Sequence, residues 1–188
     1  MREPEIKRAL TRHLMGACPR APGHFIEEVE INGGEVRADL VHLLDDIHCY
    51  EIKSDTDTLR RLVNQGSRYS RAFDRITLVV AERHLAKALP LLPLWWGVLV
   101  ITESEGSPFR KVREARPHRQ HRPEVIASLL KRNEALHLLE ELGAIKGWKS
   151  KSLYLIQDYL AQSLPLEELR RHVRDSLARR AQSEVLPV

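Results

Sequence analysis

The chain has 188 residues, of which 43% are hydrophobic and 30% are charged, and its formal net charge is +4. These values are typical of a globular domain with one sizeable core, and they exclude a disordered or low-complexity chain. The longest apolar run, residues 88–101, contains two prolines and a glycine and is shorter than the roughly 20 apolar residues that cross a bilayer. No membrane association is therefore expected.

The chain carries two cysteines, Cys18 and Cys49, whose spacing does not fit a metal site. Residues 1–5 are mostly charged and lead into an amphipathic helix, without the apolar stretch of a signal peptide. Both observations favour a reducing cytoplasm.

The first part of the chain predicts an α/β core of alternating helices and strands. Apolar residues at helical spacing predict the helices, and apolar runs between turn residues predict the strands. Asp55 or Asp57 is available to cap the second helix. Strands that flank a helix usually become parallel neighbours, so the later strands are expected to pair in parallel. In chain order the expected elements are helix 5–15, strands 25–31, 36–44 and 47–54, helix 58–73, strand 76–81, helix 84–92 and strand 95–102.

The rest of the chain divides into a basic segment and a helical region. Residues 104–123 contain one glycine, three prolines and six Lys/Arg, and predict a linker or surface arm. His118 and His121 in this segment are candidate metal ligands, but a solvated basic loop accounts for them better. Helices are expected at residues 125–142, 152–162 and 166–182, as a subdomain that rests on the core. The expected divisions are 1–103, 104–123 and 124–188.

Charge is distributed unevenly along the chain. Residues 1–109 hold 14 Lys/Arg and 16 Asp/Glu, a net charge of −2, whereas residues 110–188 hold 16 and 10, a net charge of +6. An acidic half that carries a metal centre and a basic half that grips phosphates would give this pattern. Charged residues that cover exposed helix faces explain it equally well.

The pattern with the most chemical content is Asp39, eleven intervening residues, and then Glu51-Ile52-Lys53. On a strand, Glu51 and Lys53 point to the same face. The two carboxylates and the backbone carbonyl of Ile52 are hard oxygen ligands of the kind that Mg²⁺ prefers. Lys53 is placed to orient a metal-activated water, to help it lose a proton, or to stabilise charge in the transition state. An ion cluster without catalysis is the alternative, although burying one without a ligand is costly.

The expected site requires a particular number of residues in the turn at Asp45-Asp46. A plain two-residue hairpin would pair Asp39 with Ile52 and place Asp39 and Glu51 on opposite faces of the sheet. One extra residue in the turn, or one bulge, shifts the register and sets Asp39 opposite Glu51. We therefore expect the hairpin to contain that extra residue.

These residues support a resemblance. Asp39, Glu51 and Lys53 in a hairpin, followed by a helix and a strand, resemble the PD-(D/E)XK nuclease superfamily, although Ala38 stands where the superfamily's name has a proline. Over most of its length, and most strongly over residues 25–101, the chain resembles the sce7726 family of uncharacterised bacterial proteins. The stretches that carry this likeness are 27–28, 37–40, 50–62, 65–69, 73–74, 77–80 and 95–100.

The resemblance implies a restriction-endonuclease-like core of a helix, a three-stranded meander, a helix and a strand. It also implies a glutamate that completes the metal site. Glu5 is the helical candidate, and Glu27 and Glu28 are the candidates on the first strand, of which Glu28 is favoured.

The helix after Lys53 supplies further candidates. The resemblance implies that Gln65 lies near the site, where it would contact a metal-bound water or a phosphate. Tyr69 shares its helix face, either touching the nucleic-acid backbone or packing in the core with Leu62, Gly66 and Phe73. Arginines on this helix are candidate phosphate contacts, and a solvated helix face explains them as well: Arg60, Arg61, Arg68 and Arg71.

The expected function is that of a Mg²⁺- or Mn²⁺-dependent endonuclease that hydrolyses phosphodiester bonds, with DNA expected ahead of RNA, by in-line attack of a metal-activated water. Cutting both strands of a duplex would favour a homodimer. The alternatives are a nucleic-acid-binding or interaction module that keeps the fold without cutting, and a structural partner whose basic C-terminal helices bind another protein.

Overall fold

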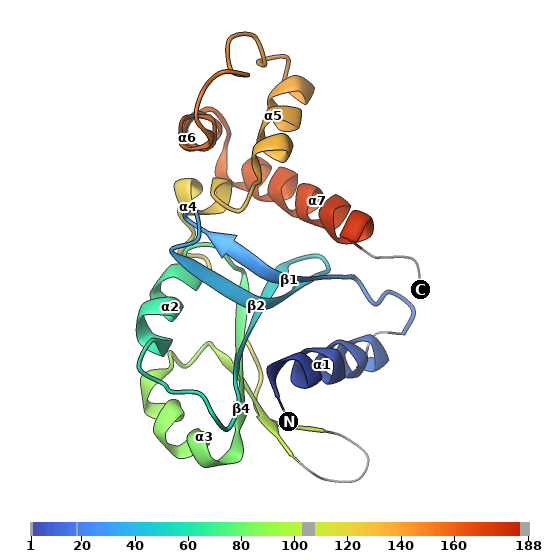
Figure 1. Ribbon diagram of the computed structural model, residues 1–188, viewed down its shortest axis with the longest axis vertical. Coiled ribbons are helices and arrows are strands. Elements are labelled where there is room, and N and C mark those ends of the chain that lie inside the picture. Colours follow the sequence, from blue (N-terminus) through green and yellow to red (C-terminus); the bar gives the residue numbers. More distant parts are fainter. Residues whose placement is uncertain (1, 18, 103–107, 185–188) are drawn as a thin grey trace.

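Within residues 2–17, 19–102 and 108–184, which this computed structural model describes, the centre of the fold is a six-stranded mixed sheet (Figure 1). The strands lie side by side in chain order. The first strand is antiparallel to the second, the second to the third, and the fifth to the sixth. β3 pairs in parallel with β4, and β4 with β5, which confirms the expectation for strands that flank a helix. The strands are β1 His24–Ile31, β2 Val36–Leu43, β3 Ile47–Lys53, β4 Arg75–Ala81, β5 Gly97–Ile101 and β6 Phe109–Arg113.

Helices cover both faces of this sheet. In Figure 1, α1 lies on one side of the sheet, α2 and α3 lie on the other, and the four C-terminal helices gather beyond β1 and β2. No helix in the described part of the chain is both long enough and apolar enough to cross a membrane. The helices are α1 Glu3–Ala17, α2 Leu62–Tyr69, α3 Glu82–Ala88 with the 3-10 turn η1 Leu89–Leu91, α4 Pro123–Ala127, α5 Arg132–Glu141, α6 Leu153–Ser163 and α7 Leu166–Glu184.

The alternation of side chains along the strands creates two hydrophobic clusters. On β3, Tyr50 and Ile52 pack with Ile6 and Leu10 of α1. The intervening residues face the other way, where Cys49 joins the larger cluster. This larger cluster runs from the sheet through α2 and α3 into buried residues of α4–α7. The C-terminal helices therefore share one continuous core with the sheet.

The β2–β3 hairpin contains the extra residue that the site requires. Leu43 pairs with Ile47, which leaves a three-residue connection closed by a hydrogen bond from the Leu44 backbone nitrogen to the Asp46 carbonyl oxygen at 3.1 Å. Leu40 pairs with Tyr50. The extra residue in the turn is therefore confirmed. The ladder ends at the Leu40–Tyr50 pair, and Ala38 and Leu40 enter different hydrophobic clusters, so the regular alternation of β2 does not continue through Asp39.

The second helix begins later than the sequence predicts. Residues 58–61 are not helical, and α2 runs only from Leu62 to Tyr69, without a side-chain cap. Asp57 does not cap this helix. Its Oδ2 accepts hydrogen bonds from the Ser54 backbone nitrogen (2.8 Å) and from the Ser54 hydroxyl (2.6 Å). The aspartate therefore closes the turn that ends β3 instead of starting a helix.

The expected linker is part of the sheet. Within residues 104–123, β6 pairs with β5, and Phe109 and Ala115 are buried. Farther on, backbone hydrogen bonds join Arg116 to Trp95, His118 to Asp74 and Arg122 to Arg71. The strand was missed because its exposed positions carry arginine and lysine, as expected of a sheet edge.

The interpretation of this segment as a solvated loop is also wrong for its two histidines. His118 stacks on Trp95 with ring centroids 3.9 Å apart, and His121 is only 9% exposed. The expected helix at 125–142 is divided into α4 and α5, because Lys131 has extended backbone and its nitrogen donates to the Glu134 side chain at 2.7 Å, which starts a new helix.

A close helix contact makes Gly66 a sensitive position. A Cβ atom there would lie 2.9 Å from Trp96 Cζ2, and Trp96 is 1% exposed. We expect Gly66→Ala to lower the free energy of unfolding by about 1–3 kcal/mol through overpacking, despite alanine's better helix propensity. Gly16→Ala in α1 is the matched control, because an added Cβ atom there would have no neighbouring atom within 4 Å. This substitution should be neutral or stabilising by up to about 1 kcal/mol. Urea unfolding of both variants tests this, and a more stable Gly66→Ala protein would contradict it.

Candidate metal centre

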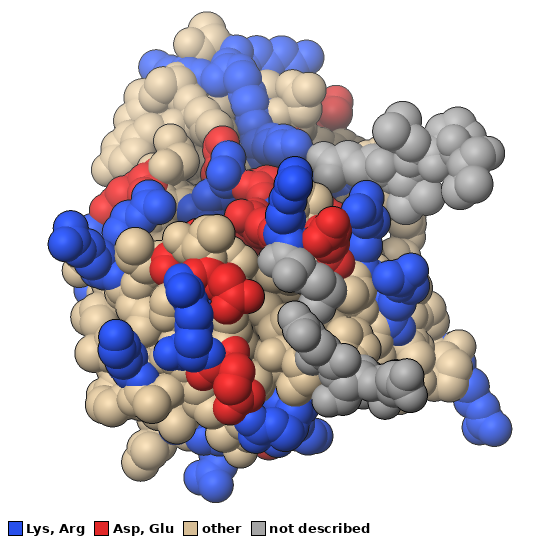
Figure 2. Space-filling model, turned by 60° about the horizontal axis from the view of Figure 1, so that its bottom comes forward, with Lys and Arg blue, Asp and Glu red and all other residues tan. Residues whose placement is uncertain are grey.

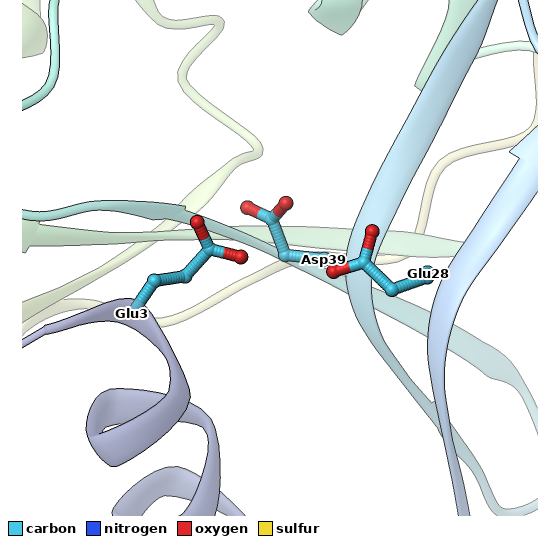
Figure 3. Close-up of side chains that lie close together, drawn as sticks. All are labelled: Glu3, Glu28 and Asp39. Carbon is cyan, nitrogen blue, oxygen red and sulfur yellow. The ribbon is translucent and has the colours of Figure 1, made fainter.

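Three carboxylates from three separate elements meet beside the β2–β3 hairpin. Glu3 comes from the first turn of α1, Glu28 from β1 and Asp39 from β2, and one oxygen atom of each lies within 4.8 Å of the others. Figure 3 shows the three side chains converging, with Asp39 between the other two. Carboxylate oxygens at this separation are suited to hold one divalent cation.

The backbone of β1 turns Glu28 toward this cluster. Its φ is 58°, in the left-handed region that residues other than glycine rarely adopt. The usual alternation of the strand is broken there, so Ile26 and Val29 both enter the same hydrophobic cluster. Glu28 therefore lies beside Asp39, as expected of the favoured glutamate, whereas Glu27 is exposed.

The backbone of the neighbouring strand and nearby charges both act on Asp39. Its Oδ2 accepts a hydrogen bond from the Ile52 backbone nitrogen at 2.7 Å. Burial and the Glu51 carboxylate raise the pKa of Asp39 to about 7, against the opposing effects of that hydrogen bond and of Lys53. A carboxyl group with this pKa gains from a cation that would keep it ionised.

Glu51 is completely buried, and both of its oxygens are engaged. Lys53 Nζ lies 2.5 Å from Oε1, and the Tyr69 hydroxyl donates to Oε2 at 2.7 Å. Burial is the main cause that raises the pKa of Tyr69, so this hydroxyl stays protonated and able to donate. Glu51 and Lys53 thus lie on the same face of β3, as predicted, and Tyr69 bonds to Glu51 from α2, but among the described residues Glu51 is not one of the three carboxylates that converge.

Gln65 carries an unsatisfied group at the same place. Its Nε2 lies 3.4 Å from the Tyr69 hydroxyl, while its buried Oε1 has no hydrogen-bond partner in the described structure. A buried amide oxygen without a partner is unusual and is suited to accept from a ligand or a bound water. The structure therefore brings Gln65 to the site, as the sequence predicted.

These groups line a groove of about 370 Å³. Residues of the β1–β2 turn and of the turn after β3 form part of its wall. Its lining residues are Glu3, Glu30, Gly34, Glu35, Val36, Arg37, Asp39, Glu51, Ile52, Lys53, Asp57, Arg61 and Gln65.

Sequence reasoning missed two members of the site. Glu3, not Glu5, is the glutamate that α1 contributes; Glu5 is exposed and accepts a hydrogen bond from the Arg2 backbone. Pro4 was the available signal, because proline favours the first helical turn and so places the helix start at Glu3. Lys7 was also missed: it is 5% exposed and forms ion pairs with Glu3 and Glu28.

The candidate nucleic-acid contacts have different outcomes. Tyr69 is 0% exposed and cannot touch a nucleic-acid backbone, so that assignment is wrong and its interpretation as a core residue is correct. Arg68 is held by Glu35, whose carboxylate also lines the groove. Arg60 and Arg61 are exposed, and Arg61 reaches the groove wall.

Some of the arginines in the basic C-terminal half form ion pairs within the fold. Arg170 pairs with Asp74 and Arg180 with Glu134, so these cations hold α7 to the rest of the fold. Three exposed lysines lie on the connection between α5 and α6, at Lys146, Lys149 and Lys151. Figure 2 shows another face, on which acidic side chains gather near the middle with lysine and arginine around them.

The raised pKa of Asp39 predicts a pH dependence. An ordinary aspartate has a pKa of 3.8, so the folded, metal-free protein holds this proton more tightly than the unfolded chain does. The stability contributed by the neutral form is complete below that value and is lost as the pH rises to about 7. A divalent ion competes with the same proton. We expect Mn²⁺ to raise the Tm more at about pH 8 than at about pH 5.5. Melting curves with and without Mn²⁺ test this, and equal shifts at the two pH values would contradict it.

The fold and the groove define a mixed α/β protein with an acidic, lysine-containing site at a β-hairpin. A family model described as bacteriophage P4 protein cII matches residues 1–186, and the chain belongs to this family. It is 26% identical over 182 residues to Protein cII of Enterobacteria phage P4, a match that covers 96% of this chain and 68% of that protein.

One solved structure is also similar, the SPO1766 protein of unknown function from Silicibacter pomeroyi. The TM-score is 0.44 and the sequence identity 23%, over 78% of this chain and 92% of that one. The names of these matches state no reaction. The resemblance to the sce7726 family and to the PD-(D/E)XK superfamily stays a prediction.

Proposed function

We propose that this protein is a metal-dependent nuclease that hydrolyses phosphodiester bonds, with DNA as the expected substrate. The observation that carries the proposal is the convergence of Glu3, Glu28 and Asp39 next to the buried Glu51–Lys53 pair. The order of elements from α1 through the β1–β3 meander and α2 to β4 is the order expected of a restriction-endonuclease-like core. Both the order of the elements and the arrangement of charged side chains therefore support the proposal.

The groups at the site fit Mg²⁺ or Mn²⁺. The available donors are oxygens: the carboxylates of Glu3, Glu28 and Asp39, with the buried Gln65 Oε1 nearby. The sequence-predicted ligands Glu51 and Ile52 also line the groove. A divalent ion held there would polarise the phosphate and make a bound water more acidic.

The remaining groups have separate roles. Lys53, whose Nζ lies 2.5 Å from Glu51, lines the groove, where its positive charge can stabilise the negative charge that develops on the phosphate. Tyr69 positions Glu51, and so acts on Lys53 indirectly. Arg61 is exposed at the groove wall, where it can contact a neighbouring phosphate of the strand.

One observation favours the alternative, a nucleic-acid-binding module that does not cut. Lys7 and Arg37 already pair with Glu28 of the cluster, and Lys53 pairs with the neighbouring Glu51, so part of the negative charge is neutralised without a metal. In that case the groove would still bind phosphates but would lack hydrolytic chemistry.

Cleavage assays separate the two functions. Linear, circular, single-stranded and branched DNA, and an RNA of matching sequence, should be incubated with the protein and Mg²⁺ or Mn²⁺, beside Lys53→Gln protein. Metal-dependent cutting that is lost in the variant supports the nuclease. Salt-sensitive binding without cutting, by folded wild-type protein and with either metal, would establish the binding module instead.

A further inference from the structure

A lysine on α1 occupies a position that packing does not explain. Ile6, Ala9 and Leu10 are the apolar buried residues of α1, and Lys7 is buried among them with 5% of its surface exposed. Burying an ammonium group is costly unless it is paired. The sequence therefore places a charge where an aliphatic residue would have packed with less cost.

The partners of Lys7 are the carboxylates of the candidate metal centre. Its Nζ lies 2.9 Å from Glu3 Oε1, bonds to Glu28 Oε1, and is 3.9 Å from Glu27 Oε2. Lys7 thus remains a cation inside the cluster.

Asp39 differs from the other carboxylates of the cluster. In the described structure it has no ion pair, and its hydrogen bond comes from the neutral backbone of Ile52. Glu28, in contrast, pairs with both Lys7 and Arg37. The position for an additional cation therefore lies on the Asp39 side of the cluster, away from Lys7.

The balance of charge limits how many ions fit. The carboxylates of Glu3, Glu27, Glu28, Asp39 and Glu51 lie with the cations Lys7, Arg37 and Lys53, so these groups carry two more negative than positive charges. One divalent ion balances this excess. A second divalent ion would leave an excess of two positive charges in a partly buried site, which is unfavourable.

We propose that Lys7 takes the place of a second metal ion, so that the site binds a single divalent cation beside Asp39. This inference rests on the proposed metal site and specifies its stoichiometry. Lys7 is a positioning residue here: it holds Glu3 and Glu28 together, and its charge excludes the second ion.

Counting bound ions tests this directly. The protein should be stripped of metal with a chelator and titrated with Mn²⁺, whose free form is counted by its electron paramagnetic resonance signal. We expect one Mn²⁺ per chain for wild-type and Lys7→Arg proteins, and two for Lys7→Met, in which the first ion also binds about tenfold or more tightly because a nearby positive charge is gone. Lys87→Met, at an exposed lysine on α3, is the control and should behave as wild type.

Each outcome has a distinct meaning. Two ions on wild-type protein would overturn the inference without any substitution, so the test does not depend on the folding of a variant. One ion on a folded Lys7→Met protein would overturn the role of Lys7. No ion on wild-type protein would instead overturn the proposed metal site, independently of Lys7. Circular dichroism of each variant establishes that it is folded.

Discussion

Asp39→Asn is expected to abolish metal-dependent cleavage while it stabilises the metal-free protein at neutral pH and above. Asparagine retains an oxygen for the hydrogen bond from the Ile52 backbone but removes the negative charge. Loss of groups that merely orient metal ligands costs about 10–100-fold. Loss of a ligand itself should therefore lower the cleavage rate by more than about 100-fold, with no recovery at higher Mn²⁺.

The opposite effect on stability follows from the pKa of the same residue. Burial and the Glu51 carboxylate raise the pKa of Asp39 to about 7, which means that the fold disfavours the ionised form. Asparagine removes that penalty where the carboxyl is ionised, so the Tm should rise at about pH 8 and change little at about pH 5.

Glu35→Gln is the matched control for this prediction. Glu35 also lines the groove, but it is exposed and paired with Arg68 instead of facing the cluster. Its replacement should leave cleavage within a few-fold of wild type and the Tm nearly unchanged. An Asp39→Asn protein that cuts at the wild-type rate would remove Asp39 from the site. A less stable Asp39→Asn protein at pH 8 would contradict the electrostatic argument.

The parts of this site that lie close together in sequence were predictable. Glu51 and Lys53 share a strand, so the period of two fixes their common face. The requirement that Asp39 oppose Glu51 predicted the three-residue turn, because one register shift moves every side chain to the other face. Gln65 and Tyr69 share a helix face, although burial decided that Tyr69 supports Glu51 from within.

The parts that depend on distant contacts were not predictable. The left-handed backbone at Glu28 has no local signal such as glycine or asparagine at that position. Lys7 looked like an ordinary charged helix residue, because only the packing of α1 against the sheet shows that it is buried. β6 was missed for a similar reason: its arginines and lysines are typical of an exposed segment, and only the pairing with β5 makes it a strand.

Asp74→Ala should cause the largest loss of stability among these substitutions. The side chain is 10% exposed, and its Oδ2 accepts a hydrogen bond from the Ile47 backbone nitrogen at 2.7 Å. Its Oδ1 pairs with Arg170 of α7 and lies 3.3 Å from His121 Nε2. One carboxylate therefore joins the start of β3, the segment after β6 and the last helix.

Alanine would remove one partner from each of three polar groups, although Arg170 keeps its bond to Glu167 and His121 Nε2 keeps the Phe73 carbonyl oxygen. Removing one member of a buried ion pair typically costs about 3–5 kcal/mol, because the other charge stays uncompensated. Arg170 is partly exposed, so we expect the lower end of this range, about 3 kcal/mol. Asp74→Asn should cost less, since its amide oxygen can still accept from the Ile47 nitrogen.

Glu167→Ala separates this effect from the loss of an ordinary ion pair. Glu167 also bonds to Arg170, at 2.6 Å, but its side chain is 81% exposed. Its removal should change the free energy of unfolding by less than about 1 kcal/mol. Urea unfolding of the three variants at pH 7 provides the measurement. If Asp74→Ala costs no more than Glu167→Ala, then the buried carboxylate does not hold α7 to the sheet, and the apolar contacts of the shared core must do so instead.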